Sequence, residues 1–207
     1  MKLTNILLVA ILCGLTACAS MSKEECLTAD WKTIGYEDGS LGRPDSTIQS
    51  HRKSCAKINV TPDLAQYQQG HREGARAYCK KSTGYQLGVS GGAYYNICPP
   101  DLEASFLQAY RLGQELYVLT QSIAKVQSDI SSYRSSVNEL EKQKLTEKDA
   151  IVEGGSAKER RQHLKEIDHL DAEMRRYQDD IGHAEHELNH LKQDYANLQA
   201  EHRRMGY

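Results

Sequence analysis

Cysteines and histidines are the side chains of this 207-residue sequence whose types and spacing are best suited to chemistry. Four of them, Cys26, Cys55, Cys79 and Cys98, fall within one segment. Four cysteines in an oxidising compartment predict two disulfides, with three possible connectivities. We favour Cys26–Cys55 and Cys79–Cys98, because each pair joins neighbours along the chain. A metal site is the alternative, but no pair has the C-x-x-C spacing typical of zinc ligands.

Cys18 stands in a different context, at the end of a secretory signal. Met1-Lys2 and the apolar run Ile6–Leu12 give the charged start and the short hydrophobic core of such a signal. The run is too short to span a membrane as a mature helix. It ends in Leu15-Thr16-Ala17-Cys18, which matches the bacterial lipobox. We therefore expect cleavage after residue 17 and lipidation of Cys18; an ordinary signal peptide with an incidental cysteine is the alternative.

Lipidation of Cys18 would anchor the protein to a membrane through a polar tether, residues 18–25. Diacylglycerol and palmitate together supply three acyl chains, which hold a protein stably where a single chain does not. Ala19 follows the cysteine in place of Asp. This favours sorting to the outer membrane, with the body of the protein in the periplasm.

Three histidines near the C-terminus, His183, His186 and His190, have helical spacing that places them on one outward stripe. His186 and His190 have the i, i+4 spacing that lets two imidazoles chelate one metal ion. Zn²⁺ or Cu²⁺ could bind there, or the stripe could change its charge as the pH falls. The alternative is a solvated helix face, because a structural zinc site normally needs four ligands.

Catalytic motifs are absent from the sequence. A Cys/His nucleophile pair needs a free thiolate, and a disulfide would remove it from the cysteines near His51 and His71. Gly-x-Ser-x-Gly does not occur, and Gly88–Gly92 is glycine-rich without the Lys-Ser/Thr end of a phosphate loop. The net charge of −2 gives no basic surface for nucleic acid. We predict a protein that is not an enzyme, with no cofactor and no nucleic-acid partner.

Heptad repeats in the last hundred residues predict the elements that position the histidine stripe. Apolar residues recur at alternating steps of four and three, the a/d pattern of a coiled coil. They are Leu112, Leu116, Leu119, Ile123, Val126, Ile130, Tyr133, Val137 and Leu140, then Ile167, Leu170, Met174, Tyr177, Ile181, Ala184, Leu188, Leu191, Tyr195, Leu198 and Met205. The glycine pair within residues 153–157 predicts a chain reversal. Residues 114–207 should therefore form a long antiparallel helical hairpin.

The segment before the hairpin, residues 26–113, should be a small helical head stapled by the disulfides. Thr61-Pro62-Asp63 and Pro99-Pro100-Asp101 are helix starts, and the second of these helices should continue into the hairpin. Two earlier helices are expected around Leu27–Gly39 and Ser46–Lys57. No stretch alternates with period two for long enough to predict a strand. The predicted fold class is all-α.

A degenerate Tyr-x-x-Gly repeat runs through the head, at Tyr36, Tyr67, Tyr85 and Tyr110. Glycine costs about 1 kcal/mol relative to alanine in a helix, so its recurrence one turn after a tyrosine suggests backbones that approach closely. Packing of the head's own helices is one interpretation. The other is a groove for an extended glycan strand or peptide, lined by Trp31, Tyr67, Gly70, Gly74, Tyr85 and Gly88.

The combined spacing of cysteine, glycine and tyrosine in the head resembles a proteobacterial lipoprotein family catalogued as domain of unknown function 2799. The residues that carry the resemblance are Cys26, Asp30-Trp31, Ile34-Gly35, Asp38-Gly39, Gly42, His51, Cys55, Tyr67-x-x-Gly70, Gly74, Tyr78-Cys79, Gly88, Gly91, Cys98-Pro99, Leu102-Glu103, Phe106 and Tyr110-x-x-Gly113. It covers residues 26 to about 117 and leaves the hairpin out. The resemblance implies an envelope lipoprotein, and it implies no activity or catalytic residue.

These patterns together predict a structural or protein-interaction role in the cell envelope, with the hairpin contacting another envelope component. Hairpins of this kind meet a second coiled coil or dock as a helix in a groove. Two alternatives remain: a periplasmic binding module whose head holds a cell-wall glycan or peptide, and a metal- or pH-responsive histidine stripe. Homo-oligomers are possible in each case.

Overall fold

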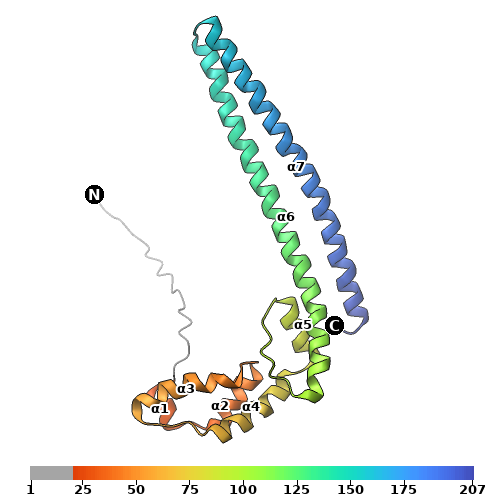
Figure 1. Ribbon diagram of the computed structural model, residues 1–207. Helices are drawn as coiled ribbons and strands as arrows, with labels where there is room; N and C mark the ends of the chain where they lie inside the picture. The colour runs from red at the N-terminus through yellow and green to blue at the C-terminus, as the bar shows by residue number, and fades with distance from the viewer. Residues whose placement is uncertain (1–20) are drawn as a thin grey trace, which may run out of the picture. The chain divides into compact units, whose positions relative to one another are not determined.

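The computed structural model describes residues 21–207 (Figure 1). The predicted signal peptide and Cys18 lie outside the described residues. Between residues 21 and 207 the structure is helical with no strand, which confirms the predicted all-α class. Two compact units divide these residues: the first contains residues 21–79 and 94–102, and the second contains residues 80–93 and 103–207. The predicted boundary between residues 113 and 114 falls inside a continuous helix.

The first unit is built from short helices whose starts are fixed by side-chain caps. Its helices are α1 (Lys23–Leu27), α2 (Trp31–Ser40), η1 (Asp45–Thr47), α3 (Ile48–Cys55), η2 (Ala56–Ile58) and α4 (Leu64–Tyr78). Asp30 caps α2 and Asp63 caps α4, each accepting hydrogen bonds from backbone amides of the first turn. The expected helix Leu27–Gly39 corresponds to α2 but starts later, at Trp31, because Asp30 is its N-cap; Leu27 is the last residue of α1.

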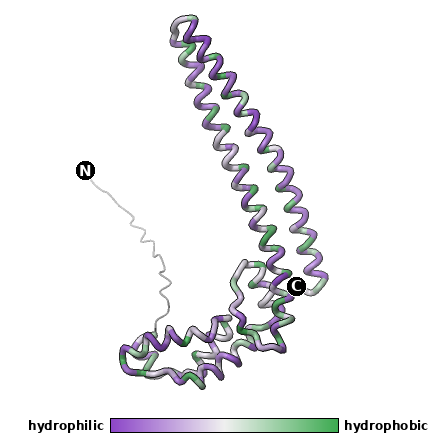
Figure 2. Tube along the Cα trace, viewed as in Figure 1, coloured by the Kyte–Doolittle hydropathy of each residue, from purple (hydrophilic) through white to green (hydrophobic). Residues whose placement is uncertain are grey.

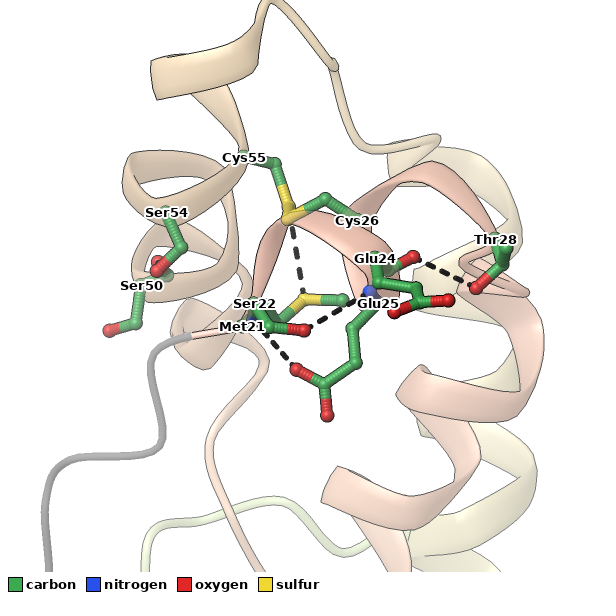
Figure 3. The surroundings of a disulfide bond; sticks show 9 residues. All are labelled: Met21, Ser22, Glu24, Glu25, Cys26, Thr28, Ser50, Ser54 and Cys55. Carbon is green, nitrogen blue, oxygen red and sulfur yellow. Dashed lines mark hydrogen bonds between the residues drawn. A yellow bond between two sulfur atoms is a disulfide. The ribbon is translucent and has the colours of Figure 1, made fainter.

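Both predicted disulfides are confirmed, Cys26–Cys55 and Cys79–Cys98. The first ties α1 to the end of α3 and lies in the core with Trp31 and Tyr67. Figure 3 shows Met21 beside this disulfide and Ser22 and Glu25 in the reciprocal capping box that starts α1. A disulfide in so small a unit stabilises it by about 2–4 kcal/mol.

The second unit contains α5 (Lys81–Val89), most of α6 (Pro100–Glu153), and α7 (Ala157–Arg204). Helices α6 and α7 form the predicted hairpin, and the chain reverses between them (Figure 1). Gly154 and Gly155 both have positive φ, and Ser156 begins α7 with a capping box to Glu159. The sequence does not predict α5, because three glycines lie in or next to it and glycine disfavours helix formation.

The heptad positions lie between the two arms of the hairpin. Every predicted position from Leu112 to Leu140 and from Ile167 to Leu198 is buried or half-buried, whereas Met205 caps α7 and is exposed. The rings of Tyr133 and Tyr177 meet across the hairpin with centroids 5.9 Å apart. Figure 2 shows hydrophobic segments recurring along both arms among hydrophilic ones. Each arm therefore buries the apolar stripe of the other.

Glycines bring two pairs of helices into backbone contact. In the first unit, a Cβ at Gly70 of α4 would overlap the carbonyl oxygen of Lys32 in α2, and a Cβ at Gly39 of α2 would lie 2.9 Å from the nitrogen of Ala75. Real Cβ atoms essentially never approach other atoms below 3.0 Å. Only glycine therefore allows α2 and α4 to pack this closely.

The second unit repeats this construction in α5 and α6. Gly35, Gly39 and Gly42 of the first unit recur as Gly84, Gly88 and Gly91. Gly42 and Gly91 both have positive φ, and each lies under the ring of a tyrosine on the partner helix, Tyr78 and Tyr117 respectively. A cysteine precedes each helix of the second pair, as in the first. The head thus contains the same glycine-packed arrangement of two helices twice.

Candidate functional site

The residues predicted to line a ligand groove lie inside the helix pairs instead. Trp31 and Tyr67 belong to the first unit's buried core. Gly70 and Gly74 face the α2 backbone, and in the second unit Gly88 faces the α6 backbone while Tyr85 is half-buried. At the three glycines, the backbone of the partner helix occupies the space that a side chain would fill. The repeat serves helix packing.

The histidine stripe is exposed, as its heptad positions predict. The rings of His186 and His190 lie 4.5 Å apart. Among residues 21–207, no group of three or more histidine, cysteine or acidic side chains is placed to hold a metal ion. His183 instead lines a small hollow with Asp180 and Glu187 of its own helix and residues of α6. The described structure does not form the three-histidine metal site.

A buried carboxylate in the first unit is the strongest candidate site. Asp38 of α2 is only 2% exposed. Its Oδ2 accepts hydrogen bonds from the Tyr67 hydroxyl at 2.8 Å and from His51 Nε2 at 2.9 Å, and its Oδ1 accepts one from Arg43 at 2.8 Å. Helices α2, α3 and α4 and the loop after α2 each contribute one of these groups. We call Asp38, Arg43, His51 and Tyr67 the Asp38 cluster.

Electrostatics in the Asp38 cluster favour an ionised carboxylate and a protonated phenol. Burial by itself would raise the pKa of Asp38, but the hydrogen bonds from His51, Arg43 and Tyr67 outweigh it and hold the pKa below its ordinary value. Burial, together with the neighbouring Asp38 carboxylate, raises the pKa of Tyr67 far above its ordinary value. The phenol therefore remains a donor at every physiological pH.

His51 completes the cluster with one nitrogen that has no partner. An ionised carboxylate can only accept, so His51 Nε2 must carry the hydrogen of the bond to Asp38. In a neutral ring Nδ1 is then an acceptor, and it has no hydrogen-bond partner among the described residues. His51 is 8% exposed, so solvent does not readily supply a donor. A buried acceptor without a donor costs about 1–3 kcal/mol.

A cavity of about 410 Å³ adjoins the cluster. Asp38, Arg43 and His51 form part of its wall, together with the acidic side chains Glu25, Asp30 and Glu37. Met21, Ala29 and Ile34 supply an apolar part of the wall. The cavity falls within the range of about 300–1,000 Å³ that is usual for small-molecule sites.

The duplicated helix pair shows that packing does not require the Asp38 cluster. In the second pair, Leu87 stands at the position of Asp38 and the fully buried Phe106 at the position of Tyr67. Gln86 and Cys79 stand at the positions of Glu37 and Asp30. The same glycine-mediated packing forms around these residues without a buried charge. The polar residues of the first pair therefore point to a role beyond holding two helices together.

No motif in the sequence marks this cluster, although Asp38 and His51 are both among the residues that carry the family resemblance. An alignment of the two helix pairs does reveal the cluster, because Asp38 then aligns with Leu87 and Tyr67 with Phe106. No helix among residues 21–207 combines the length and apolarity that a membrane crossing requires.

Residues 30–115 match a family model described as "Protein of unknown function (DUF2799)". This confirms the resemblance predicted for the head and, as predicted, leaves the hairpin outside it. No curated protein and no solved structure matches the chain. The matched segment contains the Asp38 cluster, the lining acids Asp30 and Glu37, and the packing glycines of both helix pairs.

Proposed function

We propose that this protein is a lipoprotein of the outer membrane, anchored through Cys18, whose periplasmic body contacts another envelope protein through the tip of its hairpin. The signal sequence and lipobox support the anchor. The contact is supported by the surface of the hairpin near residues 145–164.

Three exposed apolar side chains near the hairpin turn carry this proposal. Val152 is 85% exposed, Leu145 is 59% exposed and Leu164 is 52% exposed. Leu145 and Val152 stand one heptad apart on α6 and therefore face the same side. His163 bonds Glu147 at 2.6 Å across the hairpin, which places Leu164 at a level between them. A group of exposed apolar residues at one end of a charged hairpin is typical of an interaction site.

The hairpin needs no second chain to bury its heptad stripe, because its own arms do so. Ion pairs also join the arms on the surface, Arg134 with Glu185 at 2.7 Å and Lys144 with Asp171. The apolar residues near the turn are outside the stripe and stay exposed. We therefore expect the partner to meet the tip with apolar side chains rather than to replace an arm.

Photo-crosslinking in living cells tests the contact. A photoreactive residue at Glu153, the exposed last residue of α6, should give a discrete crosslinked band that mass spectrometry identifies as another envelope protein. Ser131 is the matched control, because it holds the same heptad position as Leu145 and Val152 but lies far from the turn. Substituting both Leu145→Ser and Val152→Ser should abolish the band while circular dichroism shows the hairpin intact. A band of crosslinked copies of this chain alone, or equal bands from Glu153 and Ser131, would contradict the proposal.

A further inference from the structure

Two exposed histidines of α7 form a pair on the surface of the hairpin. His186 and His190 stand one helical turn apart, at heptad positions f and c, outside the apolar stripe. His183, the third histidine of the predicted stripe, lines a hollow with residues of α6, and neither of the other two histidines belongs to that hollow. The ligand set to consider is therefore a pair of imidazoles.

The distance between the two rings is that of two imidazoles bound to one metal ion. The ring centroids of His186 and His190 are 4.5 Å apart. A ligating imidazole nitrogen lies about 2.0–2.1 Å from the ion and about 1.1 Å from its own ring centre, so imidazoles at adjacent corners of a square-planar site have centroids about 4.5 Å apart. At the wider angle of a tetrahedral site the same centroids would be about 5.2 Å apart. The observed spacing therefore fits a square-planar ion.

The two side chains are free to turn their nitrogens toward a shared ion. Rotation about the Cβ–Cγ bond of histidine is broad and weakly restricted. It reorients the nitrogens but hardly moves the ring centre, which lies close to the axis of that bond. His186 and His190 are both exposed, so no packed neighbour blocks this rotation. The centroid distance is thus kept while both rings present a nitrogen to the same point.

The charge around the pair favours a cation. Between residues 183 and 194 three carboxylates stand against the single Lys192. Two of them, Glu187 and Asp194, lie within about one turn of His190. No group of three or more ligating side chains within residues 21–207 is placed to hold a metal ion. The two imidazoles would therefore be the protein's only ligands, and water would fill the remaining positions.

We infer that His186 and His190 together bind one divalent transition-metal ion, with Cu²⁺ held most tightly. Imidazole suits copper, nickel and zinc, the tetragonal geometry suits Cu²⁺ and Ni²⁺, and the general order of affinity places Cu²⁺ first. Mg²⁺ and Ca²⁺ prefer oxygen ligands and should not bind here. The bound ion joins two successive turns of α7 and so stabilises that part of the helix. The inference is independent of the contact proposed for the hairpin tip.

Titration calorimetry with Cu²⁺ on the full chain, purified without a histidine tag, tests the inference. Glutamine is a good helix former and both histidines are exposed, so His186→Gln and His190→Gln should keep the helix, as circular dichroism will check. Each should weaken the binding of Cu²⁺ by about a hundredfold, the lower end of the gain from a second linked ligand. His183→Gln is the matched control, because it removes a histidine of the same stripe and should leave the affinity unchanged.

Electron paramagnetic resonance of the bound Cu²⁺ counts its nitrogen ligands. The wild type should show hyperfine coupling to two imidazole nitrogens, and either single variant to one. Binding should also weaken at about pH 5, because only neutral imidazoles coordinate a metal ion. Equal affinity of the wild type, His186→Gln and His190→Gln would overturn the inference, as would an equal loss in His183→Gln or a single nitrogen in the wild-type spectrum. The crosslink from the hairpin tip would be unaffected by any of these results.

Discussion

Glycine-to-alanine substitutions at Gly70 and Gly182 make the same chemical change and should have opposite effects. Both glycines lie inside α-helices and neither has a positive φ. In an unobstructed helix the alanine is favoured by about 1 kcal/mol. At Gly182 nothing lies within 4 Å of an added Cβ, so this gain should be realised in full.

At Gly70 the added Cβ would overlap the Lys32 carbonyl oxygen and lie 2.8 Å from its carbon and 2.9 Å from the Tyr36 nitrogen. These are backbone atoms, so no side chain can rotate away and helices α2 and α4 must separate. Overpacking of this kind costs about 3 kcal/mol at the upper end of its usual range. After the helix-propensity gain of about 1 kcal/mol, the net loss should be about 2 kcal/mol. For a unit of this size, that lowers the melting temperature by roughly 8–16 °C.

Urea unfolding measures both effects with separate probes. Trp31 is the only tryptophan, and it lies buried in the first unit beside α4, so its fluorescence reports Gly70→Ala. Far-ultraviolet circular dichroism is dominated by the hairpin and reports Gly182→Ala. Arg72→Ala, exposed on the same helix as Gly70, is a control that should change the free energy of unfolding by less than about 0.5 kcal/mol. Gly70→Ala as stable as the wild type would refute the close packing of α2 and α4.

Three further predictions follow from individual contacts. Tyr67→Phe removes one hydrogen bond to the Asp38 carboxylate and should destabilise the first unit by about 1.5–3 kcal/mol in urea unfolding followed by Trp31 fluorescence, since the ring position is kept. The folded state holds the pKa of Asp38 below its value in the unfolded chain. The ionised carboxylate therefore contributes its full stabilisation above about pH 4, and this stabilisation is lost as the pH falls through the folded-state pKa. Asp38→Asn should accordingly make the free energy of unfolding fall less steeply between about pH 5 and 2. Tyr85→Ala removes the hydroxyl that lies 3.2 Å from His202 Nδ1, and hydrogen exchange should accelerate in the last turns of α7 but not near the hairpin turn.

The sequence predicted the hairpin well because its pattern is long and periodic. Twenty heptad residues with one break leave few alternative folds. The pair Tyr133–Tyr177, one ring from each arm, lies where the hairpin register requires. The favoured disulfide pairing was also confirmed: of the three possible connectivities, the one that joins neighbouring cysteines along the chain is the one formed. Thr61-Pro62-Asp63 and Pro99-Pro100 located the starts of α4 and α6 approximately, but the N-cap of α4 is Asp63 and not Thr61.

Prediction failed where tertiary packing overrides local preference. Helix α5 contains Gly84 and Gly88, which disfavour an isolated helix, yet these glycines are what allow it to contact α6. The same glycines suggested an open groove, because their spacing indicates close approach without saying what approaches. The residues of the Asp38 cluster come from three helices and a loop that are separated in sequence, so no local sequence pattern predicts the cluster.

Helix α6 joins two kinds of packing in one continuous element. Near its start Phe106, Ala109 and Gly113 are buried, with Gly113 against the backbone of α5; from Leu116 onward its buried residues face α7. Tyr85 of α5 stacks on Tyr207 with ring centroids 5.1 Å apart and bonds His202, so the end of α7 is held at the same helix pair. The hairpin is thus fixed at its base on both arms, while the apolar tip is free. An element held at one end and exposed at the other presents its tip at a defined distance from its base, as the proposed contact with another protein requires.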